Sequence, residues 1–160
     1  MKILWSPWRI KYIEGFKKGY ECIFCLKPSL KKDKENFILK RGKYSFVIMN
    51  IFPYNPGHLM IAPYRHIGDF EKLNNEEIEE IFEFLKKSIE ILKKVYSPDG
   101  FNVGLNIGKI AGAGFYEHIH FHIVPRWAGD TNFMPVIGNT KVISEELKRT
   151  YKKIKKYYDK

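Results

Sequence analysis

The sequence is poor in cysteine: its 160 residues contain only two, both in the motif Cys22-Ile23-Phe24-Cys25. So low a count excludes the disulfide framework of a small secreted domain. Long hydrophobic runs are also missing. No stretch approaches the roughly 18 apolar residues of a membrane span, and residues 1–9 lack the apolar middle of a signal peptide. We therefore predict a cytoplasmic protein with no membrane partner.

Acidic residues are outnumbered, because 18 Asp and Glu against 28 Lys and Arg give a formal net charge of +10. Such a charge suits a nucleic acid, an anionic surface or a small polyanionic substrate. Much of it is lysine in runs typical of solvated faces, and aromatic and basic residues do not interleave, which disfavours a nucleic-acid partner. Hydrophobic residues at 44% exclude a disordered chain, and the length fits one domain over residues 1–160.

Periodicity predicts the secondary structure, beginning after a polar stretch, 27–36, that is interpreted as a loop. Short apolar runs predict four strands, at 37–40, 44–49, 58–62 and 101–107, with the first two joined as a hairpin. Apolar residues at three- and four-residue steps predict a helix over 75–96, with a capping box from Asn74 to Glu77. The same spacing after Ser144 predicts a C-terminal helix. This order of elements indicates an α+β fold.

The segment 117–126 holds three of the five histidines, which alternate with apolar residues. Because successive side chains of a strand point to opposite faces, a strand here has one apolar face and one face of imidazoles. The imidazoles belong to His118, His120 and His122. Three histidines in one row are unusual for an ordinary polar strand face, so we predict that this face binds a ligand or takes part in a reaction.

The Cys22 and Cys25 pair is either a metal clip or a redox pair, since the predicted compartment disfavours a structural disulfide. A thioredoxin-like pair opens a helix after a strand, whereas this one lies near the N-terminus among aromatic residues. A metal clip is therefore favoured. Two thiolates are half of a zinc site, so two further ligands must come from elsewhere in the chain.

The residues His118-Ile119-His120-Phe121-His122-Ile123-Val124 resemble the signature of the histidine-triad (HIT) family, and Asn50 with the segment 56–63 is similar to its strand pair. The resemblance covers residues 20–136. Further segments resemble the bacterial branch of diadenosine tetraphosphate phosphorylases: 9–12, the C-x-x-C motif, 54–58, 111–114 and 125–135. Many members have Gln-Ser/Thr-Val before the triad. Here 114–117 reads Gly-Phe-Tyr-Glu, so no phosphate-contacting hydroxyl is carried over.

The resemblance implies a HIT-like fold, an antiparallel sheet of about five strands packed with helices. An N-terminal zinc-binding arm, 1–36, and a C-terminal helical tail, 137–160, complete it. The implied zinc site is structural, with the ligands Cys22, Cys25, His66 and His118. A divalent cation accompanying the substrate phosphates is a further expectation. The family also implies a homodimer or higher homo-oligomer, which the aromatic residues of the arm and tail favour.

The implied function is cleavage of dinucleoside polyphosphates such as diadenosine tetraphosphate, with inorganic phosphate or water as acceptor. A neutral imidazole suits attack on phosphorus because it brings no charge against the surrounding oxygens. By resemblance, His120 is this nucleophile, and His122 with His58 flanks the phosphates as donors. The implied substrate-binding residues are Asn50, His58, Asn106, Gly112, Ala113 and Gly114. The phosphate contacts of the glycine-rich loop come largely from its backbone amides.

Two alternatives remain open at this level. In the first, His118, His120 and His122 hold a catalytic zinc, since alternate residues of a strand are able to share a metal ion. In the second, the chain is a non-catalytic purine-nucleotide-binding module. The first leaves the two cysteines without partners, and the second rests on net charge alone.

Overall fold

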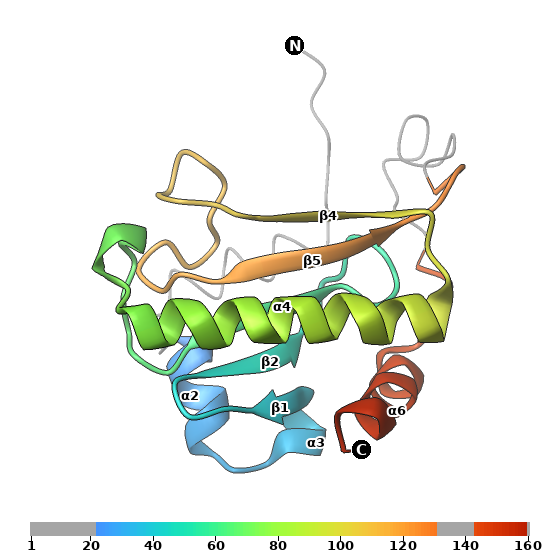
Figure 1. Ribbon diagram of the computed structural model, residues 1–160, viewed down its shortest axis with the longest axis horizontal. Helices are drawn as coiled ribbons and strands as arrows, with labels where there is room; N and C mark the ends of the chain where they lie inside the picture. The colour runs from blue at the N-terminus through green and yellow to red at the C-terminus, as the bar shows by residue number, and fades with distance from the viewer. Residues whose placement is uncertain (1–21, 131–142, 160) are drawn as a thin grey trace.

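A computed structural model describes residues 22–130 and 143–159 and is built around a five-stranded sheet (Figure 1). The strand order is β1-β2-β3-β5-β4, and every neighbouring pair is antiparallel. The strands are β1 (Ile38–Arg41), β2 (Ser45–Met49), β3 (Leu59–Pro63), β4 (Gly100–Leu105) and β5 (Phe121–Arg126). The predicted α+β fold is confirmed, and the first four strands shift by only a residue or two.

Helix α4 (Asn75–Tyr96) crosses one face of the sheet, and α6 (Leu147–Tyr158) packs beside it (Figure 1). The predicted capping box is present, because the Glu77 amide donates to Asn74 Oδ1 at 2.8 Å and the Asn74 amide donates to Glu77 Oε2 at 3.0 Å. Ser97 ends the helix in a left-handed conformation. Within the described residues, no helix is long and apolar enough to cross a bilayer.

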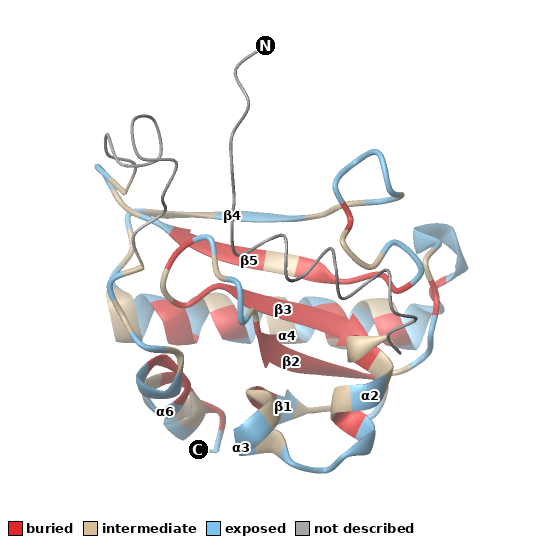
Figure 2. Ribbon diagram, turned by 180° about the vertical axis from the view of Figure 1, so that it is seen from behind, coloured by how far each residue is buried: buried red, intermediate tan, exposed pale blue. Residues whose placement is uncertain are grey.

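The sheet separates two hydrophobic cores, and alternate residues of its strands belong to each. Figure 2 shows that β2 and β3 are buried, whereas β4 is exposed or half-buried. The larger core lies between the sheet and helices α4 and α6. The smaller core lies on the opposite face, where α2 (Ile23–Ser29) contributes the buried side chain of Phe24. Its other buried members are Ile38, Phe46, Ile48, Met60 and Ala62.

The histidine segment has the predicted faces but a shorter ladder than predicted. Ile119, Phe121 and Ile123 all enter the larger core, as the alternation requires. Regular pairing begins only at Phe121, however, because the opposing strand ends at Pro63, which has no backbone N–H to donate. The Ile119 amide instead donates to the carbonyl of Ile67 at 2.6 Å. His118 and His120 thus lie in the segment leading into β5.

The loop predicted over 27–36 is wrong, because α2 and α3 (Asp33–Asn36) occupy most of it. These helices are too short for a clear period, and tertiary contacts hold them. Arg41 of β1 makes a bidentate ion pair with Asp33 at 2.7 and 3.0 Å and also donates to the Pro28 carbonyl at 2.8 Å.

The C-terminal helix is confirmed, but its aromatic residues do not form surplus surface. Tyr151 donates from its hydroxyl to the Ile38 carbonyl, and the buried Tyr158 hydroxyl bonds to Ser88 Oγ. These side chains belong to the core of their own chain, so they give no support for an oligomer. The tryptophans of the arm, Trp5 and Trp8, lie outside the described residues.

Candidate functional site

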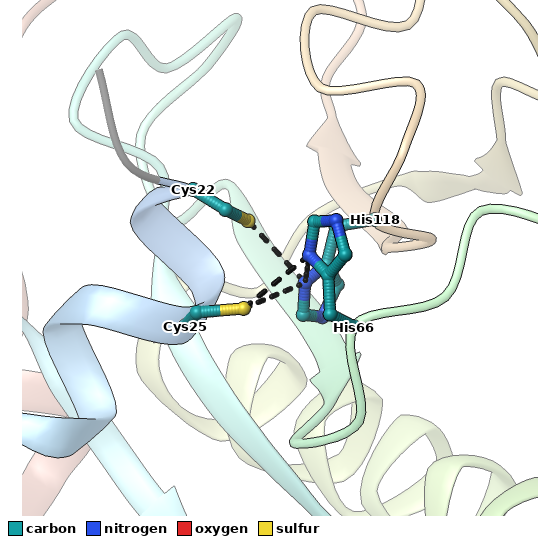
Figure 3. A group of neighbouring side chains, drawn as sticks. All are labelled: Cys22, Cys25, His66 and His118. Atoms are coloured by element: carbon teal, nitrogen blue, oxygen red, sulfur yellow. Dashed lines mark hydrogen bonds between the residues drawn. The ribbon is translucent and has the colours of Figure 1, made fainter. Parts of the chain in front are cut away.

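Four side chains from three separate segments meet on the face that carries the smaller core (Figure 3). Cys22 and Cys25 come from the start of α2, His66 from the loop after β3, and His118 from the segment before β5. Their ligand atoms all lie within 4.8 Å of one another. The structure therefore brings together the four residues of the predicted metal site.

The spacing of these atoms fits a tetrahedral zinc ion. Zn–S bonds of about 2.3 Å and Zn–N bonds of about 2.0 Å separate neighbouring ligand atoms by about 3.3 to 3.8 Å. Nδ1 of His118 lies 3.3 Å from the Cys22 sulfur, 3.5 Å from the Cys25 sulfur and 3.3 Å from Nδ1 of His66. The Cys25 sulfur lies 3.4 Å from His66 Nδ1. The donor set suits a closed structural site.

Two further features agree with metal binding. His118 Nε2 lies 2.9 Å from the Pro63 carbonyl, which fixes the proton on Nε2 and turns the Nδ1 lone pair toward the cysteines. Burial, followed by the charge of Cys22, raises the pKa of the Cys25 thiol to about 11. A zinc ion compensates the charge of two adjacent thiolates, so zinc binding displaces these protons.

His120 presents a free nitrogen next to this cluster. Its Nδ1 lies 2.8 Å from the His118 carbonyl, and since a carbonyl only accepts, Nδ1 carries the proton. Nε2 therefore holds a lone pair, and no described residue forms a hydrogen bond with it. Burial is the main cause that lowers the pKa of His120, despite the opposing effect of this hydrogen bond. A neutral imidazole with a free ring nitrogen is able to attack an electrophilic centre.

His58 and His122 form a second, oriented pair. The Tyr54 amide donates to His58 Nδ1 at 3.1 Å, so neutral His58 carries its proton on Nε2. This Nε2 lies 2.9 Å from His122 Nδ1 and donates to it. His122 consequently carries its own proton on Nε2, which has no partner among the described residues. His122 is thus prepared to donate a hydrogen bond.

Burial keeps both members of this pair neutral. The pKa of His58 falls to about 3, first because of burial and then because a positive charge on it would be repelled by any charge on His122 or His120. The pKa of His122 falls to about 4 for the same main reason, with a smaller contribution from His120. From the sequence we expected His58 to flank the phosphates. It is only 1% exposed, however, and lies behind His122.

A cavity of about 340 Å³ opens in front of His122. Asn106, which the resemblance assigns to substrate binding, lines it together with Tyr54 and Arg126. Arg126 is held in place by a bidentate ion pair with Asp130 at 2.6 and 2.9 Å and donates to Asn102 Oδ1 at 2.6 Å. The cavity is therefore lined by an amide, an aromatic ring and a guanidinium group that an ion pair holds in place.

Of the predicted loop residues, Gly112 lies next to Asn106, which lines this cavity. Gly112 has a φ of +90°, which favours glycine, and a Cβ there would lie 3.9 Å from Asn106 Nδ2. Its amide donates to the Lys109 carbonyl, whereas those of Ala113 and Gly114 have no acceptor in the described part of the chain. Asn50 accepts from the Phe52 amide at 2.9 Å and lies 3.4 Å from His58 Nδ1 through its amide nitrogen.

The alternative of three triad histidines around one metal ion is wrong. His118 turns to the cysteines, His120 bonds to a carbonyl, and His122 bonds to His58. In the part of the chain that the structure describes, the cysteine cluster is the only group of three or more candidate ligands close enough to hold a metal.

Two residues of the site escaped sequence reasoning. The Tyr54 ring lies over His58 with centroids 4.7 Å apart, and the Phe24 ring stacks on His120 at 4.5 Å. Both residues stand inside recognised motifs, but their aromatic character alone predicts only burial. The tertiary structure was needed to show that each ring lies against a histidine, and the Phe24 contact joins residues far apart in the chain.

An antiparallel sheet that presents alternating histidines beside a Cys2His2 cluster defines a domain of histidine-triad type. The chain belongs to this family, since the HIT domain matches residues 31–129. AP-4-A phosphorylase of Mycobacterium tuberculosis is 40% identical over 154 residues, 92% of this chain and 79% of the relative. An adenosine 5′-monophosphoramidase of Schizosaccharomyces pombe is 32% identical over 105 residues, 66% and 74% of the two chains.

The fold is also found in solved structures. A Zn-bound histidine triad family protein from Mycobacterium smegmatis superposes with a TM-score of 0.70 at 21% identity. The match covers 87% of this chain and 94% of that one. It supports the fold assignment.

Proposed function

We propose that this protein cleaves dinucleoside polyphosphates, with diadenosine tetraphosphate as the leading substrate, through a nucleotide covalently bound to His120. The observation that carries the proposal is the set of hydrogen bonds that fixes the protons on the histidines. These bonds leave His120 Nε2 as a free base and make His122 Nε2–H a donor in the same site. One site thus supplies a nucleophile and, beside it, a group that stabilises charge.

In the first step, the lone pair of His120 Nε2 attacks the α-phosphorus, and the bond from that phosphorus to the bridging oxygen breaks. The electron pair stays on the oxygen of the departing nucleoside triphosphate. His122 donates its Nε2 proton toward the phosphate oxygens that gain charge, and His58 orients His122 from behind. In the second step the acceptor attacks the same phosphorus, and the bond to Nε2 breaks.

The remaining predicted residues are assigned to substrate binding. The amides of Ala113 and Gly114 and the side chain of Asn106 are assigned as donors to the non-bridging oxygens. Gly112 allows the loop to approach closely, and Asn50 serves the ribose. The Cys2His2 cluster has a structural role, because its four protein ligands leave no position for a substrate.

The relative with 40% identity is an AP-4-A phosphorylase, which favours inorganic phosphate as acceptor. The test is product analysis by ion-exchange chromatography with diadenosine tetraphosphate. We expect ADP and ATP when phosphate is present. Without phosphate, any slow hydrolysis through the same intermediate yields AMP and ATP. Two ADP molecules instead would place the attack on the β-phosphorus and overturn the assignment.

A His120→Ala variant tests the nucleophile directly. Because His120 acts on the transition state, we expect the variant to lose turnover while keeping substrate binding and zinc content. Turnover near the wild-type rate would refute a covalent intermediate at this position, whichever acceptor is used.

We retain the prediction that the protein forms a homodimer. Strand β4 lies at the edge of the sheet, and its outer side pairs with no described strand. Its Val103 is 43% exposed. An open strand edge with an exposed apolar residue is a surface that proteins usually cover.

A further inference from the structure

Phe24 connects the metal cluster with the reacting histidine. It stands between the two cysteines of the C-x-x-C motif and is only 1% exposed. Its ring lies nearly parallel to the imidazole of His120, with centroids 4.5 Å apart and an interplanar angle of 28°. The same ring contacts His118, at 5.3 Å between centroids. One side chain therefore touches both a metal ligand and the proposed nucleophile.

The position of the His120 ring depends on two contacts of different kinds. The hydrogen bond from Nδ1 to the His118 carbonyl fixes one edge of the ring at 2.8 Å. A single hydrogen bond still allows the ring to tilt about the line that joins its two atoms. A flat aromatic surface against one face of the imidazole opposes this tilt and so fixes the direction of the Nε2 lone pair.

Both contacts originate in the cluster of four ligands. Phe24 lies between the ligands Cys22 and Cys25 in the chain, and the carbonyl that accepts the hydrogen bond from His120 Nδ1 belongs to His118. Helix α2 has no side-chain cap and is only seven residues long, so its own hydrogen bonds hold it weakly. A metal ion at the cluster would fix the start of this helix, and with it Phe24.

We propose that Phe24 is a positioning residue that aligns the His120 ring, so that occupancy of the zinc cluster controls the efficiency of the nucleophile. This inference rests on the proposed function, in which His120 attacks phosphorus. Phe24 is only 1% exposed, so we assign its effect to the His120 ring and not to a contact with the substrate. A small misplacement of a reacting atom lowers the reaction rate more than it lowers substrate affinity, so we expect the effect in kcat.

The test compares Phe24→Leu with Phe46→Leu. Phe46 lies in the same small core, is equally buried and stacks on Tyr64, 5.3 Å away, and not on a histidine. Both variants lose one buried aromatic ring, so they carry similar costs in stability. With zinc bound, we expect Phe24→Leu to lose about tenfold in kcat with little change in KM. Phe46→Leu should keep kcat within about twofold of the wild type.

Nuclear magnetic resonance of histidine-labelled protein gives a readout that needs no substrate. In the zinc-bound wild type, we expect ring protons of His120 to be shifted upfield by Phe24 and to show cross-relaxation with its ring protons. The upfield shift should vanish in Phe24→Leu and persist in Phe46→Leu. Removal of zinc from the wild type by a chelator should reduce both signals.

The outcomes separate the inference from the proposed function. Zinc-bound Phe24→Leu with wild-type kcat refutes positioning by Phe24. Cross-relaxation in the wild type that is unchanged after zinc removal refutes the link to the cluster, even if the Leu variants do not fold. Activity that survives in His120→Ala refutes the proposed function instead, and the resonance shifts then still report whether Phe24 and His120 are coupled.

Discussion

The stability of the protein should depend on pH through His58, and this dependence is large enough to measure. Burial lowers the pKa of His58 in the folded protein to about 3, from 6.5 in an unfolded chain. As the pH falls below 6.5, the unfolded chain therefore takes up a proton that the folded protein excludes. Above that pH, His58 therefore leaves the free energy of unfolding unchanged, and below it His58 lowers this free energy progressively.

The magnitude follows from the same shift. Each unit of pH below the unfolded pKa removes about 1.4 kcal/mol of unfolding free energy per such group. Between about pH 7 and about pH 5.5, His58 alone should remove about 1 kcal/mol. Any folded pKa below about 4.5 gives nearly the same loss, so the result does not depend on its value. For a domain of this length the loss corresponds to about 2–4 °C in Tm.

The assay is urea denaturation of the wild type and of His58→Gln at both pH values. The variant is expected to be less stable than the wild type at both pH values. On acidification, however, its free energy of unfolding should fall by about 1 kcal/mol less than that of the wild type. Acid also releases zinc from the cysteine cluster, and the comparison removes this contribution because both proteins contain the same ligands. Equal losses in the two proteins would mean that His58 is protonated within the fold, which would refute the assigned hydrogen bonds.

Three further predictions concern the metal, the cavity and the assembly. Purified protein should contain about one zinc ion per chain by elemental analysis. The double variant Cys22→Ser, Cys25→Ser should melt at a lower temperature than the wild type. Purified protein without zinc, together with an unchanged melting temperature in the double variant, would contradict the four-ligand site. Asn106→Ala should lower kcat/KM by about tenfold or more, because a hydrogen bond to a charged phosphate is lost, and unchanged kinetics would remove Asn106 from the site. Sedimentation at micromolar concentration should give a dimer, and a monomer there would end the prediction of a homodimer.

Much of the fold could be predicted from the sequence because the relevant signals are local. The helix α4 is specified by its period and by the capping pair Asn74 and Glu77, which interact across one turn. The alternation around His120 fixed which side chains share a face, whatever the strand pairs with. The short helices α2 and α3 could not be predicted, since contacts such as that of Arg41 with Asp33 hold them.

The spacing of residues along the chain is enough to recognise the chemical groups of the site, which are a row of histidines, a pair of cysteines and a glycine-rich loop. The role of each histidine, in contrast, depends on its contacts in the folded protein. His66 meets a cysteine 41 positions away, and His58 supports His122 from 64 positions away. These contacts set which ring nitrogen carries the proton and how far burial lowers each pKa. A proton position depends on the partner in space, and local spacing does not encode that partner.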